Sequence, residues 1–193
     1  MKRIEIYCSA SDSIPEIYRS AAYRLGVLVG EARLELIYGD GGIGLMAQVA
    51  DGVLSTGGTV TGVIPRFMVD RGWHNPKSTN RIVTETMHER KAYIAREADA
   101  MVALPGGVGT FEELLECLTW KQLGLHNKPI VIVNINGYYD HLLAALDHMV
   151  EEHFMQPLHR DAMFQVVSTP EEVLPAIARA PHWGKEEQEH ARS

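Results

Sequence analysis

The order of hydrophobic patterns along this chain constrains its fold more than any other feature. Short apolar runs alternate, almost without exception, with stretches whose apolar residues recur at helical spacing. This alternation predicts a parallel sheet that is covered by helices on both faces. We therefore expect an α/β protein with a Rossmann-like, doubly wound parallel sheet of about six or seven strands.

The expected elements follow from these periods. We expect strands at residues 4–8, 34–38, 59–64, 100–104, 129–134 and 164–167. We expect helices at residues 15–29, 44–54, 110–123, 139–152 and 170–178, and another that begins at Thr86. Thr86 and Glu89 match a capping box, which predicts the start of that helix. Residues 66–80 follow neither period, and an irregular stretch of that length is more often functional than idle.

The chain of 193 residues fits one domain of ordinary size. No linker, repeat or low-complexity segment divides it, so we expect a single domain at residues 1–180. The end of the chain, from Gly184, contains no apolar residue larger than alanine. We therefore expect residues 181–193 to form a mobile tail.

The formal net charge of −7 argues against coating a nucleic acid polymer, which requires clustered Lys and Arg. The two cysteines, Cys8 and Cys117, lie in apolar patterns, and we expect buried thiols in a reducing compartment. The first residues enter a strand pattern without the apolar core of a signal peptide, and no stretch is apolar enough to cross a membrane. We therefore expect a cytoplasmic protein without a membrane partner.

The first glycine-rich loop, residues 39–44, stands between an expected strand and an expected helix. Gly39, Gly41 and Gly44 have the spacing of the dinucleotide fingerprint, whose glycines let the backbone approach a phosphate at a helix N-terminus. That fingerprint also needs an acidic residue at the end of the next strand, where this chain has Arg66. Dinucleotide binding is therefore disfavoured, and both an anion-binding loop and a simple tight turn stay open.

The second glycine-rich loop is more specific. Gly106, Gly107 and Gly109 again lie between an expected strand and an expected helix, where backbone N–H groups cradle an anion. We expect Thr110 to cap the helix and to donate its hydroxyl to a phosphate oxygen. No lysine follows the last glycine, so this is not a Walker loop.

Glu112 and Glu113 stand in the first turn of the helix expected after this loop. The run from Thr110 to Glu113 matches a capping box, so one of the two glutamates can be merely structural. Two carboxylates beside an anion site would repel a phosphate unless one points elsewhere or takes part in the chemistry.

With these motifs, the chain resembles the Lonely Guy family of cytokinin-activating enzymes, once widely labelled lysine decarboxylases. The resemblance covers residues 4 to about 167. The residues that carry it are Tyr38, Gly39, Gly44-Leu45-Met46, Gly62-Val63-Ile64-Pro65, Met87-His88-Glu89-Arg90-Lys91, Pro105-Gly106-Gly107-Val108-Gly109-Thr110-Phe111-Glu112-Glu113, Trp120, Gln122-Leu123-Gly124 and Asn136-Gly137-Tyr138-Tyr139.

The resemblance implies hydrolysis of a cytokinin riboside 5′-monophosphate, of AMP, or of both, to free base and ribose 5-phosphate. It also implies a Rossmann-like homodimer without a metal or an organic cofactor. Arg90 and Glu113 would be the catalytic pair, and the choice between Glu113 and Glu112 stays open. The nucleotide would contact Met87, Lys91, Gly41, Gly42, Gly44, Gly106, Gly107, Val108, Gly109 and Thr110.

The chain departs from the family pattern in the first loop. Asp40 stands where many members have a second glycine, and Ala47 replaces a glycine after Leu-Met. Ser9-Ala10-Ser11 replaces a Gly-Ser-Ser stretch. We expect these positions around the base and the ribose, so they bear on substrate preference more than on the reaction.

The expected chemistry suits the residue types. Breaking an N-glycosidic bond passes through an oxocarbenium-like sugar, which a carboxylate such as Glu113 can stabilise, or it can take a proton from the attacking water. Arg90 can hold that carboxylate, or a phosphate, in a bidentate hydrogen bond. A non-catalytic nucleotide-binding module is the alternative, and it would have no need of the carboxylate.

Other chemistries find less support. Pyridoxal phosphate needs a Schiff-base lysine with an acidic partner for the pyridine nitrogen, and only Lys91 and Lys121 are near the expected site. His148 and His153 are five residues apart, the wrong spacing for one helix face, so we expect no metal site. An apolar helix face at Leu114, Leu115 and Leu118 can pack internally or against a second subunit.

Overall fold

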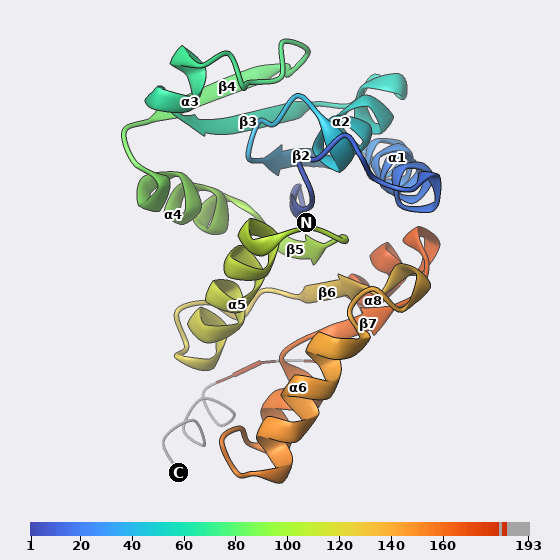
Figure 1. Cartoon of the computed structure of the whole chain (residues 1–193), viewed down its shortest axis with the longest axis vertical. Helices are drawn as coiled ribbons and strands as arrows, with labels where there is room; N and C mark the ends of the chain where they lie inside the picture. Colours follow the sequence, from blue (N-terminus) through green and yellow to red (C-terminus); the bar gives the residue numbers. More distant parts are fainter. Residues whose placement is uncertain (182, 185–193) are drawn as a thin grey trace.

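The computed structural model describes residues 1–181, 183 and 184. Its strands form one parallel sheet of seven in the order β4-β3-β2-β1-β5-β6-β7 (Figure 1). Because the chain begins at the central β1 and builds outward in both directions, the predicted doubly wound α/β fold is confirmed. The strands are β1 (Arg3–Tyr7), β2 (Glu35–Tyr38), β3 (Val60–Pro65), β4 (Asn80–Thr84), β5 (Ala100–Ala103), β6 (Ile130–Val133) and β7 (Gln165–Val167).

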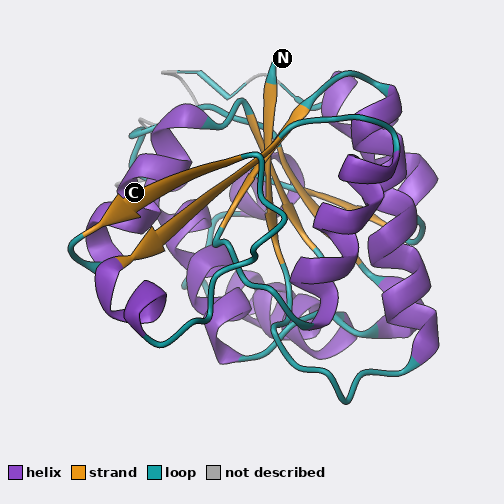
Figure 2. Ribbon diagram, turned by 90° about the horizontal axis from the view of Figure 1, so that it is seen from above, coloured by secondary structure: helices purple, strands orange, loops and turns teal. Residues whose placement is uncertain are grey.

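Helices cover both faces of the sheet, as Figure 2 shows from above. One face packs against α1 (Glu16–Glu31), α2 (Gly44–Ser55) and α8 (Val173–Ala178). The other packs against α4 (Met87–Glu97), α5 (Val108–Gln122) and α6 (Asp140–Glu151). The remaining short helices are α3 (Arg66–Asp70), η1 (Ile135–Gly137), α7 (Pro157–Ala162) and η2 (Pro170–Glu172).

Alternation along β1 divides the core. Ile4, Ile6 and Cys8 are buried towards α1 and α2, whereas Tyr7 is buried towards α4 and α5. Glu5 shares the face of Tyr7 although it is a carboxylate within an apolar strand, and only 3% of it is exposed. Both cysteines are buried as expected.

The segment expected to be irregular, residues 66–80, contains α3 and ends where β4 begins. β4 escaped prediction because it is an edge strand that pairs only with β3, so its exposed, polar start lacks the apolar run of a central strand. The six residues of α7 were also not predicted, since so short a helix shows no clear period.

Helix caps confirm one prediction and correct another. The Thr86 side chain accepts from the Glu89 N–H at 3.1 Å, as predicted, while the Glu89 carboxylate accepts from the N–H of Glu85. The predicted cap at Thr110 is wrong, because α5 begins at Val108 and its N-cap residue makes no side-chain cap bond. Because the helix begins before Thr110, with Gly107 as its N-cap residue, Glu113 does not take the capping-box position.

Trp183 lies within the segment predicted as a tail, yet its indole is buried and donates to the Lys121 carbonyl at 2.8 Å. Residues 182 and 185–193 of that prediction lie outside the described residues. Among the helices of the described part, none has the length and apolar character to cross a bilayer.

Candidate active site

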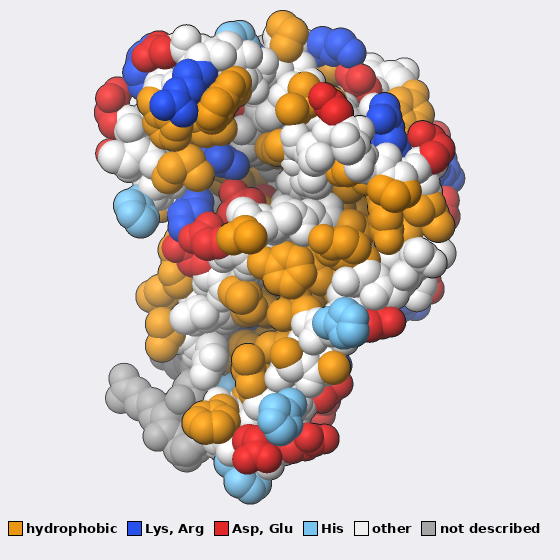
Figure 3. All heavy atoms as spheres, in the orientation of Figure 1, with side chains coloured by type: hydrophobic (Ala, Val, Ile, Leu, Met, Phe, Trp, Pro, Cys, Tyr) orange, Lys and Arg blue, Asp and Glu red, His pale blue; other side chains and the backbone are white. Residues whose placement is uncertain are grey.

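A cavity of about 690 Å³ opens at the carboxyl ends of β1, β2 and β5. This is where the strand order reverses, the usual ligand position in doubly wound sheets. In the view of Figure 3, a hollow lies in the upper half of the molecule, with hydrophobic and charged side chains around it. Residues from both glycine loops and from the segment predicted to be irregular line it.

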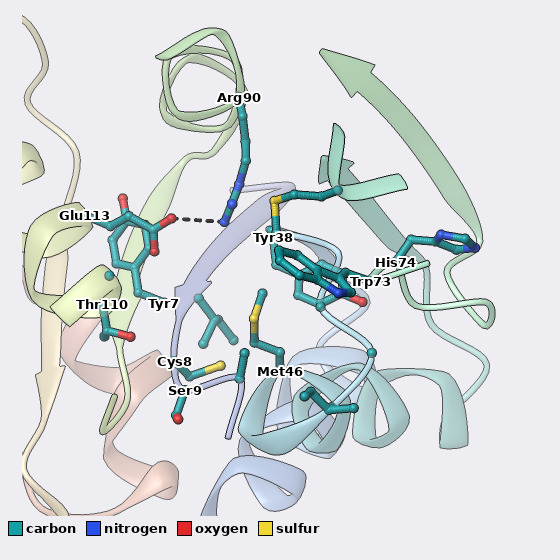
Figure 4. A pocket seen from close by; sticks show the side chains of 18 of the residues that line it. Tyr7, Cys8, Ser9, Tyr38, Met46, Trp73, His74, Arg90, Thr110 and Glu113 are labelled. Atoms are coloured by element: carbon teal, nitrogen blue, oxygen red, sulfur yellow. Dashed lines mark hydrogen bonds and ion pairs between the residues drawn. The ribbon is translucent and has the colours of Figure 1, made fainter. Parts of the chain in front are cut away.

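Arg90 and Glu113 meet across the cavity, as Figure 4 shows. The Arg90 Nη2 lies 3.1 Å from Oε1 of Glu113, with side-chain exposures of 9% and 16%. Arg90 comes from α4 and Glu113 from α5, so their contact depends on how the two helices pack beside β5. A Cβ on Gly39 would lie 2.0 Å from the guanidinium, which explains why this position takes a glycine.

Two features of Arg90 and Glu113 suit a role in catalysis. The buried Nε of Arg90 has no hydrogen-bond partner within the described residues, so a ligand oxygen can take it. Burial raises the pKa of Glu113 above its ordinary value, and the nearby Arg90 offsets this only in part. A partly desolvated carboxylate with a raised pKa is typical of a catalytic acid or base.

Glu112 and Lys91 are arranged differently. Glu112 has a side chain 51% exposed and pairs with Lys91, which also lies 3.0 Å from the Glu116 carboxylate. Although burial alone would lower the pKa of Lys91, these two carboxylates raise it. Glu112 lines the cavity and Lys91 does not. Glu113 is therefore the more buried of the two carboxylates, and Lys91 forms its ion pairs outside the cavity lining.

The second loop offers donors at the N-terminus of α5. In the described structure, the backbone N–H groups of Val108, Gly109 and Thr110 have no protein acceptor. Such orphan donors, at the positive end of a helix of 15 residues, favour an anion. Gly107, Gly109 and Thr110 line the cavity, whereas Val108 is 88% exposed outside it.

Close packing and hydrogen bonds hold the second loop in place. Gly106 does not line the cavity, and a Cβ there would lie 2.0 Å from the Thr110 hydroxyl, so this glycine permits tight packing. The Tyr138 hydroxyl donates to the Gly106 carbonyl at 2.6 Å, and that of Tyr139 donates to the Leu104 carbonyl at 2.7 Å. The donors of α5 are thus fixed before a ligand arrives.

In the first loop, two of the helix donors of α2 are already occupied. The Gly44 N–H donates to the Asp12 carboxylate at 3.2 Å, and the Met46 N–H donates to the Ser9 carbonyl at 3.2 Å. Gly44 has a φ of 63° and packs against the backbone before α1, outside the cavity lining. Gly41 and Gly42 do line the cavity. Of the two interpretations left open, the structure therefore favours a tight turn at Gly44.

Known proteins resemble this chain over most of its length. The model of a family described as "Possible lysine decarboxylase" matches residues 46–177. Cytokinin riboside 5'-monophosphate phosphoribohydrolase LOG5 of Arabidopsis thaliana is 43% identical over 159 residues, which cover 82% of this chain and 70% of that protein. LOG7 of the same plant is 44% identical, with 82% and 73% covered. The chain belongs to the Lonely Guy family.

Solved structures share the fold at lower identity. A molybdenum cofactor binding protein from Rippkaea orientalis superimposes with a TM-score of 0.71 at 20% identity, over 92% of this chain and 96% of that one. The molybdenum cofactor carrier protein of Chlamydomonas reinhardtii gives a TM-score of 0.70 at 20% identity, with the same coverage. These likenesses show the fold alone.

The older decarboxylase description of the Lonely Guy family finds no lysine to support it here. Among the described residues that line the cavity, none is a lysine. Lys121 lies in the core instead, where burial lowers its pKa to about 8 and its Nζ donates to the Lys128 carbonyl. The described part of the chain also contains no cluster of three or more His, Cys, Asp or Glu that could hold a metal ion.

Two of the departures from the Lonely Guy pattern are not part of the cavity wall. Asp40 and Ala47 are absent from the cavity lining, and Asp40 is fully buried behind it. Ser9 and Ala10 do line the cavity. The carboxylate of Asp40 turns towards Arg81 of β4, so the expected position of Asp40 around the base and the ribose stays a prediction.

Several lining residues were missed from the sequence. Met68, Trp73 and His74 come from the irregular segment, whose length alone signalled a function. Tyr38 and Glu5 come from strand positions that resemble core positions, although a glutamate within an apolar strand was a signal that was not used.

Glu5 combines burial with an oxygen, Oε2, that has no partner among the described residues. Burial, reinforced by the nearby Glu113, raises the pKa of Glu5 well above its ordinary value. A carboxyl whose pKa rises on folding holds its proton more tightly in the folded state. Its stabilising contribution is complete below the unfolded pKa of about 4.3 and is lost as the pH rises through the folded pKa.

We therefore expect Glu5→Gln to gain stability relative to the wild type as the pH rises. The difference in unfolding free energy, measured by urea denaturation at pH 5 and pH 8, should favour the variant more at pH 8. Glu31→Gln, at an exposed position, serves as control and should show no such trend. A pH-independent difference for Glu5→Gln would contradict the raised pKa.

Proposed function

We propose that this protein hydrolyses the N-glycosidic bond of a nucleoside 5′-monophosphate, which yields free base and ribose 5-phosphate. The observation that carries the proposal is the buried pair of Arg90 and Glu113 beside the unoccupied helix donors of α5. The named relatives support it, because LOG5 and LOG7 are called cytokinin riboside 5'-monophosphate phosphoribohydrolases.

The phosphate binds at the N-terminus of α5. The N–H groups of Val108, Gly109 and Thr110 and the Thr110 hydroxyl donate to its oxygens. This anchors the nucleotide so that its sugar lies above Glu113, which stands on the next turn of the same helix. Fixing the substrate in this way supplies part of the catalysis, because it removes the entropy of alignment.

Glu113 and Arg90 act at the sugar. As the bond between the anomeric carbon and the base nitrogen breaks, its electron pair leaves with the base and the sugar becomes cationic. The Glu113 carboxylate stabilises that cation and takes a proton from the attacking water, whose oxygen bonds to the anomeric carbon. The departing base takes up one proton from solvent, and Glu113 later returns to solvent the proton that it took from water, so the net reaction adds one water across the bond. Arg90 holds the carboxylate in place.

The base lies at the far side of the cavity. There Met46, Met68 and Trp73 present apolar and aromatic surface, as Figure 4 shows for Met46 and Trp73, opposite Glu113 and Thr110. Such a wall suits a purine ring through stacking and apolar contact. We propose AMP and N6-substituted AMP, including cytokinin forms, as the substrates.

We further propose a cytoplasmic homodimer. Leu114 and Leu118, on the helix face considered above, are buried within the subunit. Leu115 in the middle of α5, Leu123 at its end and Leu125 beyond it are 40%, 65% and 69% exposed and offer apolar surface. Burial of such surface against a second copy is favourable. Light scattering or analytical ultracentrifugation tests this assembly.

The proposed activity is tested by incubating the protein with AMP and with isopentenyladenosine 5′-monophosphate, followed by chromatography of the products. We expect free base and ribose 5-phosphate in equal amounts from one or both nucleotides. The ratio of the rates identifies the preferred base. Tight binding of both nucleotides with no release of base would instead indicate a binding module.

A further inference from the structure

Asp40 is an anomaly in the first glycine loop. Its side chain is 0% exposed, and its backbone has a φ of 57°, in the left-handed region that favours glycine. The carboxylate packs against Gly62 of β3 so closely that a Cβ there would lie 2.0 Å from Oδ1. Burying a charge and holding a residue at a positive φ both cost free energy, so other contacts of Asp40 must offset this cost.

Contacts around Asp40 lead to the segment of residues 72–78. Its carboxylate accepts from Arg81 Nε at 2.6 Å and from the Ser78 hydroxyl at 2.5 Å. Its carbonyl accepts from the Asn75 N–H at 2.8 Å. The Arg81 Nη2 in turn donates to the Asn75 carbonyl at 2.6 Å. One buried carboxylate and one guanidinium thus hold the middle and the end of this segment.

The same segment meets the cavity. Gly72, Trp73, His74 and Pro76 line it, and His74 forms an isolated bridge with Gly41 of the first loop. In Figure 4, Trp73 and His74 stand on the side opposite Glu113. Trp73 is 50% exposed, and the Arg71 guanidinium lies over its ring. The position of this segment therefore depends on its hydrogen bonds more than on packing in the core.

We propose that Asp40 and Arg81 are positioning residues that fix the segment of residues 72–78 as the base-side wall of the cavity. Through this wall the pair sets which bases the site accepts. The inference rests on the proposed nucleotide hydrolysis. It concerns neither the phosphate donors nor the catalytic pair, because those stand on α4 and α5 across the cavity.

The physical reason is the cost of leaving one buried charge without its partner. If Arg81 loses its charge, the Asp40 carboxylate remains buried and uncompensated, and the local structure opens to hydrate it. If the wall then occupies its competent arrangement about a tenth of the time, the apparent affinity falls about tenfold. The chemical step in bound substrate stays nearly unchanged.

The test uses Asp40→Asn and Arg81→Gln. Asparagine tolerates a positive φ, so Asp40→Asn removes the charge without forcing the backbone to move. Arg24→Gln is the matched control, because Arg24 forms an exposed ion pair with Glu171 that lies outside this segment and outside the cavity lining. Amide hydrogen exchange of residues 72–78 is measured in the ligand-free proteins, and kcat and KM are measured for AMP and for isopentenyladenosine 5′-monophosphate.

The Asn75 N–H donates to the backbone carbonyl of Asp40, and Arg81 holds the two residues together. We therefore expect both variants to speed hydrogen exchange of the Asn75 amide about tenfold or more. We expect KM for AMP to rise about five- to twentyfold with kcat within about twofold, and the preference between the two substrates to change. Arg24→Gln should alter none of these quantities.

Unchanged exchange together with an unchanged substrate preference in both variants would overturn the proposal. An equal loss of kcat for both substrates with a lower melting temperature would also overturn it, because the pair would then serve general stability alone. If the wild type hydrolyses neither nucleotide, the proposed function fails, and the exchange data still decide whether the pair holds the segment.

Discussion

Glu113→Gln is expected to lower kcat about a thousandfold while the dissociation constant for AMP changes by no more than about threefold. Glutamine keeps the size of the side chain and can still accept a hydrogen bond from Arg90, so the cavity keeps its shape. It carries no charge to stabilise the sugar cation and cannot take a proton from water. Single-turnover kinetics and isothermal titration calorimetry separate these two quantities.

Glu116→Gln is the matched control for this prediction. It lies on the same helix and also contacts Lys91, but it does not line the main cavity. We expect its kcat to stay within about threefold of the wild type, since it makes no contact with substrate. Equal losses in the two variants, or full activity of Glu113→Gln, would remove Glu113 from the chemistry.

The raised pKa of Glu113 adds a pH dependence. The carboxylate must be ionised to act, so activity falls on the acid side as the pH drops through its pKa. Because burial raises that pKa, we expect the acid limb of kcat/KM to lie above the range of an exposed glutamate.

Arg90→Ala is expected to lower kcat/KM about a hundred- to a thousandfold, as for the loss of one partner of a buried charge pair. It leaves the Glu113 carboxylate without its cation, so the pKa of Glu113 should rise further and the acid limb should move to higher pH. A truncated side chain with no effect on that limb would contradict the pairing.

Arg90→Lys separates charge from geometry. Lysine keeps the positive charge but replaces the planar guanidinium, whose Nη2 contacts Glu113 and whose Nε stays available for a ligand. We expect Arg90→Lys to keep the acid limb near that of the wild type and to recover only part of the rate. Nucleotide binding, measured by calorimetry, should persist in both Arg90 variants.

The sequence predicted the layers of this fold well because central parallel strands and amphipathic helices carry strong periods. It failed at β4, where an edge strand with a polar start is only partly covered. It also placed the start of α5 too late, because Thr110 resembles a cap, whereas glycine itself occupies the N-cap position. Local patterns thus locate elements better than they locate boundaries.

The candidate site was only partly predictable for a different reason. Arg90 and Glu113 are distant in sequence, and no spacing rule relates residues on two different helices that pack on a sheet. Their proximity could be predicted only from the family resemblance. The direction of a side chain was equally hidden. Lys91 turns to Glu112 and Glu116, and Asp40 turns to Arg81, although each stands beside residues that face the cavity.

The order of elements along the chain also divides the site into two exchangeable parts. Residues 87–113 contain Arg90, β5, the donors of α5 and Glu113, and therefore all the groups assigned to phosphate binding and bond cleavage. The wall assigned to the base comes from the earlier residues 38–81. A chimera that takes this earlier stretch from a relative should thus acquire that relative's choice of base, while bond cleavage remains with the native second half.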